Sequence, residues 1–180
     1  MPSEKLGFED NQFDLSFANF VVFLTPPDGV PALRESYRTL KPGGILIHTA
    51  WATLPVVSLA RAAHSATRPD SSAPLREIPP QWTSAQHLVD VTLQAGFAME
   101  KVRLEKVPQH MKIRDLNVFA EMMWSYLGPP VTGWLEQDEK RWHEAVEVLK
   151  KEMERTEGFR KTEDGEWEMV SIANVVIVTK

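Results

Sequence analysis

Apolar residues in the first third of the chain form two short runs on either side of an amphipathic segment. Phe13–Leu24 is apolar at both odd and even positions, as expected of a strand that is covered on both faces. Leu33, Tyr37 and Leu40 then recur at helical spacing and form one apolar stripe. Ile45–Thr49 is a second buried strand. A strand, a helix and a strand in this order form a βαβ unit, so the pattern predicts a parallel sheet.

Turn residues separate these elements at the expected places. Asp28 is a predicted N-cap and Pro31 lies in the first turn of the helix, where its missing N–H costs nothing. Lys41-Pro42-Gly43-Gly44 ends the helix, because proline does not continue it and glycine accepts a positive φ. We take this unit as the centre of the fold.

The remaining periodicities predict further helices and two more strands. The capping box Thr83-Ser84-Ala85-Gln86 marks one helix start, and Gly96 is the predicted C-cap of the same helix. In order, the predicted elements are a helix over Leu54–Ala66, a loop over Thr67–Gln81, a helix to Ala95, a strand over Met99–Val107, helices over Asp115–Leu127 and Trp134–Thr156, and a strand over Met169–Thr179.

Composition and charge narrow the class of protein. The 180 residues fit one domain, and 20 basic against 25 acidic residues give a net charge of −5, which argues against nucleic acid or an anionic membrane as partner. The chain has no cysteine, so disulfides and thiolate chemistry are excluded. No apolar run approaches the roughly 20 residues of a membrane span, and the N-terminus does not read as a signal peptide. We therefore expect a cytoplasmic protein.

An ordered set of motifs resembles the C-terminal half of class I S-adenosylmethionine-dependent methyltransferases of the ubiquinone/menaquinone-biosynthesis type. The motifs are Leu6-Gly7-Phe8-Glu9-Asp10 with Phe13-Asp14, Arg34-Glu35 with Arg38 and Leu40, Lys41-Pro42-Gly43-Gly44 with the strand to Trp51, and Gln94-Ala95-Gly96-Phe97.

The resemblance implies an α/β fold with a truncated Rossmann-like sheet, whose strands correspond to strands 4, 5, 7 and 6 of the family. It implies one methyltransferase-like domain over residues 1–180, with a helical insert at 107–165 that forms part of the substrate pocket. Asn19 and Phe20 correspond to the strand end beside the transferable methyl group. No G-x-G motif is present. We therefore expect no cofactor, or S-adenosylmethionine if the chain is a methyltransferase after all.

Three residues are candidate catalytic groups. His48 lies at the C-terminal end of a parallel strand, where open α/β sheets bind ligands, and it could donate a hydrogen bond or accept a proton. Arg61 and His64 lie one turn apart on a helix, and Arg61 could bind a carboxylate or polarise a carbonyl. The alternatives are a structural histidine at His48 and a solvated helix face at Arg61. No spacing of histidines and carboxylates indicates a metal site.

Aromatic and methionine side chains are candidates for binding an apolar substrate. Trp51 and Trp82 bracket the proline-rich loop. Methionine thioethers and flat aromatic rings suit an apolar ligand. Ordinary core or loop packing is the alternative for each. The proposed substrate-binding residues are Asn19, Phe20, Trp51, Trp82, Phe119, Met122, Met123 and Trp124.

Three functions remain open. The first is a cofactor-independent cyclase or pericyclase of the Diels–Alder type, acting on an apolar polyene or polyketide in natural-product biosynthesis, because such a reaction needs little more than a shaped apolar site and a donor. The second is a split or incomplete methyltransferase, and the third is a non-catalytic subunit of a full-length enzyme. Because Phe17–Leu24 carries no charge or proline, we expect this strand edge to pair in a homodimer.

Overall fold

A computed structural model describes residues 1–180, and the chain divides into two compact units. We call Met1–Thr53, Ile78–Pro108 and Ile172–Lys180 the sheet unit, and Leu54–Glu77 and Gln109–Ser171 the helical unit. The organisation as one domain with an insert at 107–165 stays a prediction.

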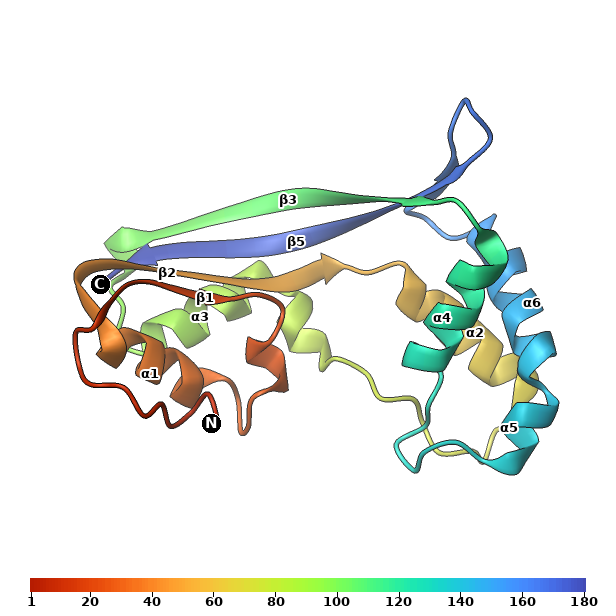
Figure 1. Ribbon diagram of the computed structural model, residues 1–180, viewed down its shortest axis with the longest axis horizontal. Coiled ribbons are helices and arrows are strands. Elements are labelled where there is room, and N and C mark those ends of the chain that lie inside the picture. The colour runs from red at the N-terminus through yellow and green to blue at the C-terminus, as the bar shows by residue number, and fades with distance from the viewer. The chain divides into compact units, whose positions relative to one another are not determined.

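Figure 1 shows the strands and helices along the chain. The strands are β1 (Phe13–Ala18), β2 (Leu40–Thr53), β3 (Val102–Ile113), β4 (Phe159–Lys161) and β5 (Trp167–Thr179). The helices are α1 (Val30–Thr39), α2 (Val56–Thr67), α3 (Ala85–Gln94), α4 (Leu116–Leu127), α5 (Glu136–Lys140) and α6 (Trp142–Met153), with short 3-10 turns η1 (Val22–Leu24), η2 (Pro80–Thr83) and η3 (Met99–Lys101).

The sheet has the predicted strand order. Its path is β1-β2-β5-β3, which corresponds to strands 4, 5, 7 and 6 of the expected fold, and β4 pairs separately with β5. β1 and β2 run parallel and are joined by α1, so the predicted βαβ unit is confirmed. β5 runs antiparallel to β2.

The sheet unit covers one face of its sheet with helices and leaves the other more open. Leu46 and Val176 are fully buried on the covered face, where they join Leu33 of α1 and Leu88 of α3 in one core. Figure 1 shows α1 and α3 on the same side of the strands. The opposite face is more accessible, and Phe17 there is 61% exposed.

The first strand is shorter than predicted. β1 ends at Ala18, whereas the apolar run predicted a strand to Leu24. Phe20 adopts a positive φ of 52°, which turns the chain out of the sheet, and Val22 then enters the core with 2% exposure. The expected pairing edge at Phe17–Leu24 is therefore wrong over most of its length, because only Phe13–Ala18 is strand.

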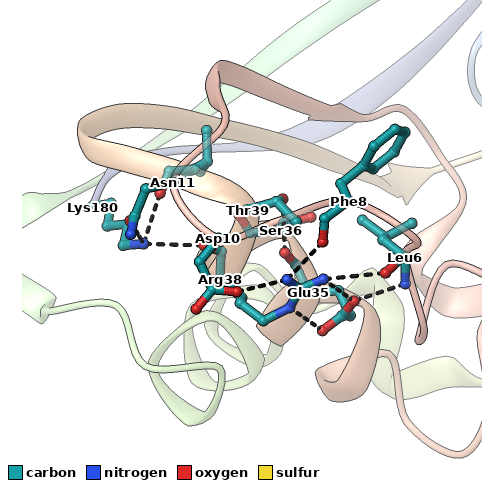
Figure 2. Close-up of polar contacts among 10 residues, drawn as sticks. Leu6, Phe8, Asp10, Asn11, Glu35, Ser36, Arg38, Thr39 and Lys180 are labelled. Atoms are coloured by element: carbon teal, nitrogen blue, oxygen red, sulfur yellow. Dashed lines mark hydrogen bonds and ion pairs between the residues drawn. The ribbon is translucent and has the colours of Figure 1, made fainter.

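The segment before β1 is held by α1 (Figure 2). The Arg38 guanidinium donates to the backbone oxygens of Leu6 and Phe8 and to the carboxylates of Asp10 and Glu35. Glu35 in turn accepts the Leu6 N–H at 2.7 Å. Hydrogen bonding to Arg38 lowers the pKa of Glu35. Glu35 and Arg38 in the matching motifs therefore act structurally here.

The helical unit has its own core. Leu59, Leu149 and Met153 are fully buried there, together with side chains of α4. The segment predicted as one helix over Trp134–Thr156 is instead divided into α5 and α6. Arg141 lies at the break, where its side chain donates to backbone oxygens at the end of α2, so the local contact outweighs helix continuity. None of the helices combines the length and apolar character needed to cross a membrane.

Candidate functional site

Four side chains meet at the C-terminal ends of β1 and β2. The Thr49 hydroxyl donates to Asn19 Oδ1 at 2.9 Å and accepts the backbone N–H of Phe20 at 2.8 Å. The rings of Phe20 and Trp51 stack with centroids 3.8 Å apart and planes inclined by 10°. We call Asn19, Phe20, Thr49 and Trp51 the strand-end cluster. Open α/β sheets bind their ligands outside this edge of the parallel strands.

The backbone at the cluster is strained. Phe20 has a φ of 52°, in the left-handed region that bulky residues rarely adopt. Such a conformation costs on the order of 1–3 kcal/mol and persists only where the surroundings impose it. The Thr49 hydrogen bond and the Trp51 stack supply that constraint. Strain of this kind is typical of functional sites.

His48 lies on the opposite face of β2 from the cluster, because successive strand residues point to opposite faces. It is fully buried, with Nε2 2.8 Å from Thr92 Oγ1. Thr92 donates its own proton to the Leu88 carbonyl, so it accepts the Nε2–H of His48. Nδ1 of His48 has no partner. Burial lowers the pKa of His48 to about 4, which makes the ring neutral at pH 7.

Trp82 packs in the core of the sheet unit. Its side chain is 4% exposed, and its ring meets His87 edge-on at 4.7 Å and Phe23 at 6.3 Å. These contacts belong to the helix-covered face of the sheet. Its role in substrate binding stays a prediction.

The two catalytic candidates on α2 belong to the helical unit. Arg61 forms two hydrogen bonds of 2.6 Å with Glu77, and these bonds lower the pKa of the carboxyl. His64 Nδ1 lies 2.9 Å from Arg68 Nη1 and accepts a hydrogen bond, because a guanidinium has only donors. Burial, and secondarily the Arg68 charge, lowers the pKa of His64. Both candidates are thus engaged in local polar contacts.

Arg68 is a buried cation that the sequence reasoning did not single out. Its Nε donates to Asp138 at 2.7 Å and its Nη1 to the Gly128 carbonyl at 3.0 Å. Its guanidinium carbon lies 4.9 Å and 5.4 Å from the ring centroids of Trp124 and Trp134. Burial alone would raise the pKa of Asp138, but hydrogen bonds from Arg68 and the Leu135 backbone lower it. The network joins the ends of α2 and α4 to the start of α5.

The substrate-binding candidates on α4 point in different directions. Phe119 and Trp124 are 5% and 1% exposed and lie in the core of the helical unit. Met123 is half-buried against that core, whereas Met122 is 50% exposed. Their role in substrate binding stays a prediction.

Of the predicted site residues, the structure brings together Asn19, Phe20 and Trp51. Thr49 completes their cluster and was missed by sequence reasoning. The signal was present in the strand alternation, which places Thr49 and Trp51 on one face of β2 and His48 on the other. The other candidates lie outside the cluster; these are His48, Arg61, His64, Trp82, Phe119, Met122, Met123 and Trp124.

Comparison with known proteins places these features in context. The family model for a methyltransferase domain matches residues 1–48, which include β1, α1 and the first part of β2. A candidate methyltransferase from Bacillus halodurans C-125 has a similar structure, with 14% sequence identity and a TM-score of 0.53 over 100% of this chain and 69% of that one. No curated protein sequence matches the chain.

Two further solved structures are more distant. The [4+2]-cyclase SpnF has 17% identity and a TM-score of 0.43, over 99% of this chain and 54% of that one. A phosphoethanolamine N-methyltransferase from Haemonchus contortus, solved with S-adenosylhomocysteine, has 16% identity and a TM-score of 0.44 over 99% of this chain and 36% of that one. The chain thus spans only part of each of these proteins.

The expectation that the chain uses no cofactor is wrong. The methyltransferase-domain match and the similarity to the Bacillus halodurans protein indicate a fold that binds S-adenosylmethionine. The expectation was based on the missing G-x-G motif, but a nucleotide site of an α/β sheet is assembled from several strand ends, and one motif does not decide it.

The strand-end cluster fits part of such a cofactor. Phe20 and Trp51 are partly exposed residues whose rings stack on each other, and an aromatic face attracts a cation such as a sulfonium within about 6 Å of the ring centroid. Asn19 adds an exposed amide beside them. With its strand order, its βαβ unit and the match over residues 1–48, the chain has a class I S-adenosylmethionine-dependent methyltransferase-like fold.

Proposed function

We propose that this chain takes part in S-adenosylmethionine-dependent methylation of an apolar small molecule. The observation that carries the proposal is the strand-end cluster at the C-terminal ends of β1 and β2. Its backbone is strained, its aromatic pair is partly exposed, and it lies where α/β sheets bind ligands.

The residues of the cluster have binding and orienting roles in this proposal. The faces of Phe20 and Trp51 hold the sulfonium region of the cofactor and a flat part of the acceptor molecule. The exposed Asn19 amide orients a polar group of the acceptor. When bound, S-adenosylmethionine supplies an electrophilic methyl group. The cluster contains no titratable side chain, so it contributes position rather than proton transfer.

Calorimetric titration of the full chain with S-adenosylmethionine and S-adenosylhomocysteine tests the proposal. We expect binding to the wild-type protein and about tenfold weaker binding to Trp51→Ala, since loss of a cation–π contact and its packing costs on the order of 1–2 kcal/mol. Trp167→Ala, in the helical unit, is the matched control and should bind like wild type. Absence of binding up to about 1 mM, or equal loss in both variants, would refute the proposal.

The proposed partner is a second copy of the chain. β1 is the last strand on its side of the sheet, and Leu15 and Phe17 on it are 56% and 61% exposed. Two such strands can pair about a twofold axis because the contact is self-complementary. Light scattering should give twice the chain mass of 20.4 kDa. Phe17→Lys should yield monomers, and Leu24→Lys, outside the strand, should not; a wild-type monomer contradicts the pairing.

A further inference from the structure

The hydroxyl of Thr49 connects the two residues that follow β1. A hydroxyl group has one donor and two acceptor positions. Here it accepts the Phe20 N–H at 2.8 Å and donates to Asn19 Oδ1 at 2.9 Å. Thr49 is itself 6% exposed, so this hydrogen-bonded pair is shielded from competition with water. One buried side chain thereby fixes both the strained backbone of Phe20 and the orientation of the Asn19 amide.

The orientation of Asn19 determines which polar group it offers to a ligand. Its oxygen accepts the Thr49 proton, and the residue is exposed. The NH₂ group is then the part of the amide that remains to donate, and a ligand group that pairs with it must be an acceptor. A carbonyl oxygen meets that requirement, whereas an ammonium group or a hydrocarbon does not.

An aromatic platform adjoins this donor. Phe20 follows Asn19 in the chain, and its ring lies nearly parallel to Trp51 at 3.8 Å. Thr49 fixes the backbone of Phe20 and Trp51 stacks on one face of its ring. The platform is therefore preorganised for a ligand. Flat unsaturated molecules pack well on such rings.

From these contacts we infer that the strand-end cluster selects a flat, unsaturated substrate that carries a hydrogen-bond acceptor such as a ketone oxygen, and that Thr49 is the positioning residue for this selection. The inference rests on the proposed function, since it names the substrate class of the same site. Asn19 and the aromatic pair contact the substrate, and Thr49 acts through them.

A pair of isosteric probes tests the selection without any cofactor. 2-Acetylnaphthalene and 2-isopropenylnaphthalene have nearly the same shape, but only the first has a carbonyl oxygen. Equilibrium dialysis against the full chain should show about fivefold to tenfold tighter binding of the acetyl compound, which is the effect of one hydrogen bond. Trp51→Ala should weaken binding of both probes by a similar factor and keep the preference.

Substitutions at Thr49 separate positioning from general structure. Thr49→Val keeps the shape but removes the hydroxyl, so the preference for the acetyl probe should fall to about onefold while the isopropenyl probe still binds. Thr49→Ser restores a hydroxyl and should restore the preference. Asn19→Asp, at an exposed position that keeps an acceptor for Thr49, removes the NH₂ donor and should abolish the preference even if Thr49→Val fails to fold.

Several outcomes overturn the inference. These are equal affinity of the wild-type protein for the two probes, no binding of either probe up to about 1 mM, and a preference that survives both Thr49→Val and Asn19→Asp. The proposed function fails differently, through absence of S-adenosylmethionine binding. A probe preference in a protein that does not bind S-adenosylmethionine would refute methylation and leave the substrate selectivity standing.

Discussion

Removing the titratable group at His48 should change how the stability of the protein depends on pH. The ring is fully buried, its Nε2–H donates to Thr92 Oγ1, and its Nδ1 has no partner. A proton on Nδ1 would therefore place an uncompensated charge in the core. Burial accordingly lowers the pKa from 6.5 to about 4 in the native state.

The direction in which pH changes the free energy of unfolding follows from the number of protons that the native and the unfolded protein bind. Well above pH 6.5 the ring is neutral in both native and unfolded protein, and its contribution to stability does not change. As the pH falls, the unfolded chain binds a proton that the native protein does not, so stability decreases. The free energy of unfolding should lose about 2 kcal/mol by about pH 5 and about 3 kcal/mol by about pH 4, where the native ring also begins to protonate.

Urea unfolding of wild-type protein and His48→Gln at about pH 7.5 and about pH 5 measures this contribution. Glutamine keeps an N–H donor for Thr92 but does not titrate. The other histidines contribute to both proteins, so the difference between the two pH dependences isolates His48. We expect the wild type to lose about 2 kcal/mol more than the variant. Equal pH dependences would refute the buried neutral ring.

Three further predictions concern other contacts. Arg68→Ala should lower the free energy of unfolding by about 3–5 kcal/mol, because it leaves the carboxylate of Asp138 buried without its partner. Urea unfolding measures this loss, and a loss below about 1 kcal/mol would contradict the prediction. Arg38→Ala should speed amide exchange at Leu6, whereas Arg34→Ala, on the same helix, should not. Equal exchange rates in the two variants would contradict the role of Arg38 in holding the segment before β1. Binding of the neutral 2-acetylnaphthalene should be independent of pH between about 6 and 8, because the strand-end cluster has no titratable group; a clear pH dependence would implicate a residue outside it.

The βαβ unit was predictable because its signals are local. The Lys41-Pro42-Gly43-Gly44 motif, which lies at the start of β2, and the apolar runs around it indicate this unit, and the resemblance supplies the order of the remaining strands. The end of β1 was not predictable in this way. Val22 and its neighbours are as apolar as a strand, but Val22 is buried in the core as the first residue of η1. An apolar run reports burial, and it does not report whether the backbone stays in the sheet.

Most of the candidate site depended on the direction of side chains. His48 was selected because it lies at the end of a parallel strand, and Trp51 because it borders the proline-rich loop. The two residues differ by three positions, and an odd spacing puts them on opposite faces of β2. Thr49 has the parity of Trp51 and belongs with it. The alternation of side chains along β2 would therefore have placed Thr49, and not His48, on the face that carries Trp51, from the sequence alone. Arg68 offered no such signal, since its partner Asp138 is 70 positions away.

The same geometry explains why the missing glycine motif was a poor guide to the cofactor. In a parallel sheet the ligand is held by several strand ends, and each strand brings only its own turn residues to the common edge. A glycine-rich turn serves the strand that carries it, and its absence says nothing about the groups at the ends of β1 and β2. The groups at these two strand ends have to be assessed from their own geometry. Here that geometry is the strained backbone of Phe20, the ring of Trp51 stacked on the Phe20 ring, and the buried Thr49 hydroxyl that orients Asn19. Backbone strain has a cost and clusters at functional sites, so the conformation of Phe20, which Thr49 and Trp51 impose, is the strongest local argument for the proposed ligand site at this edge of the sheet.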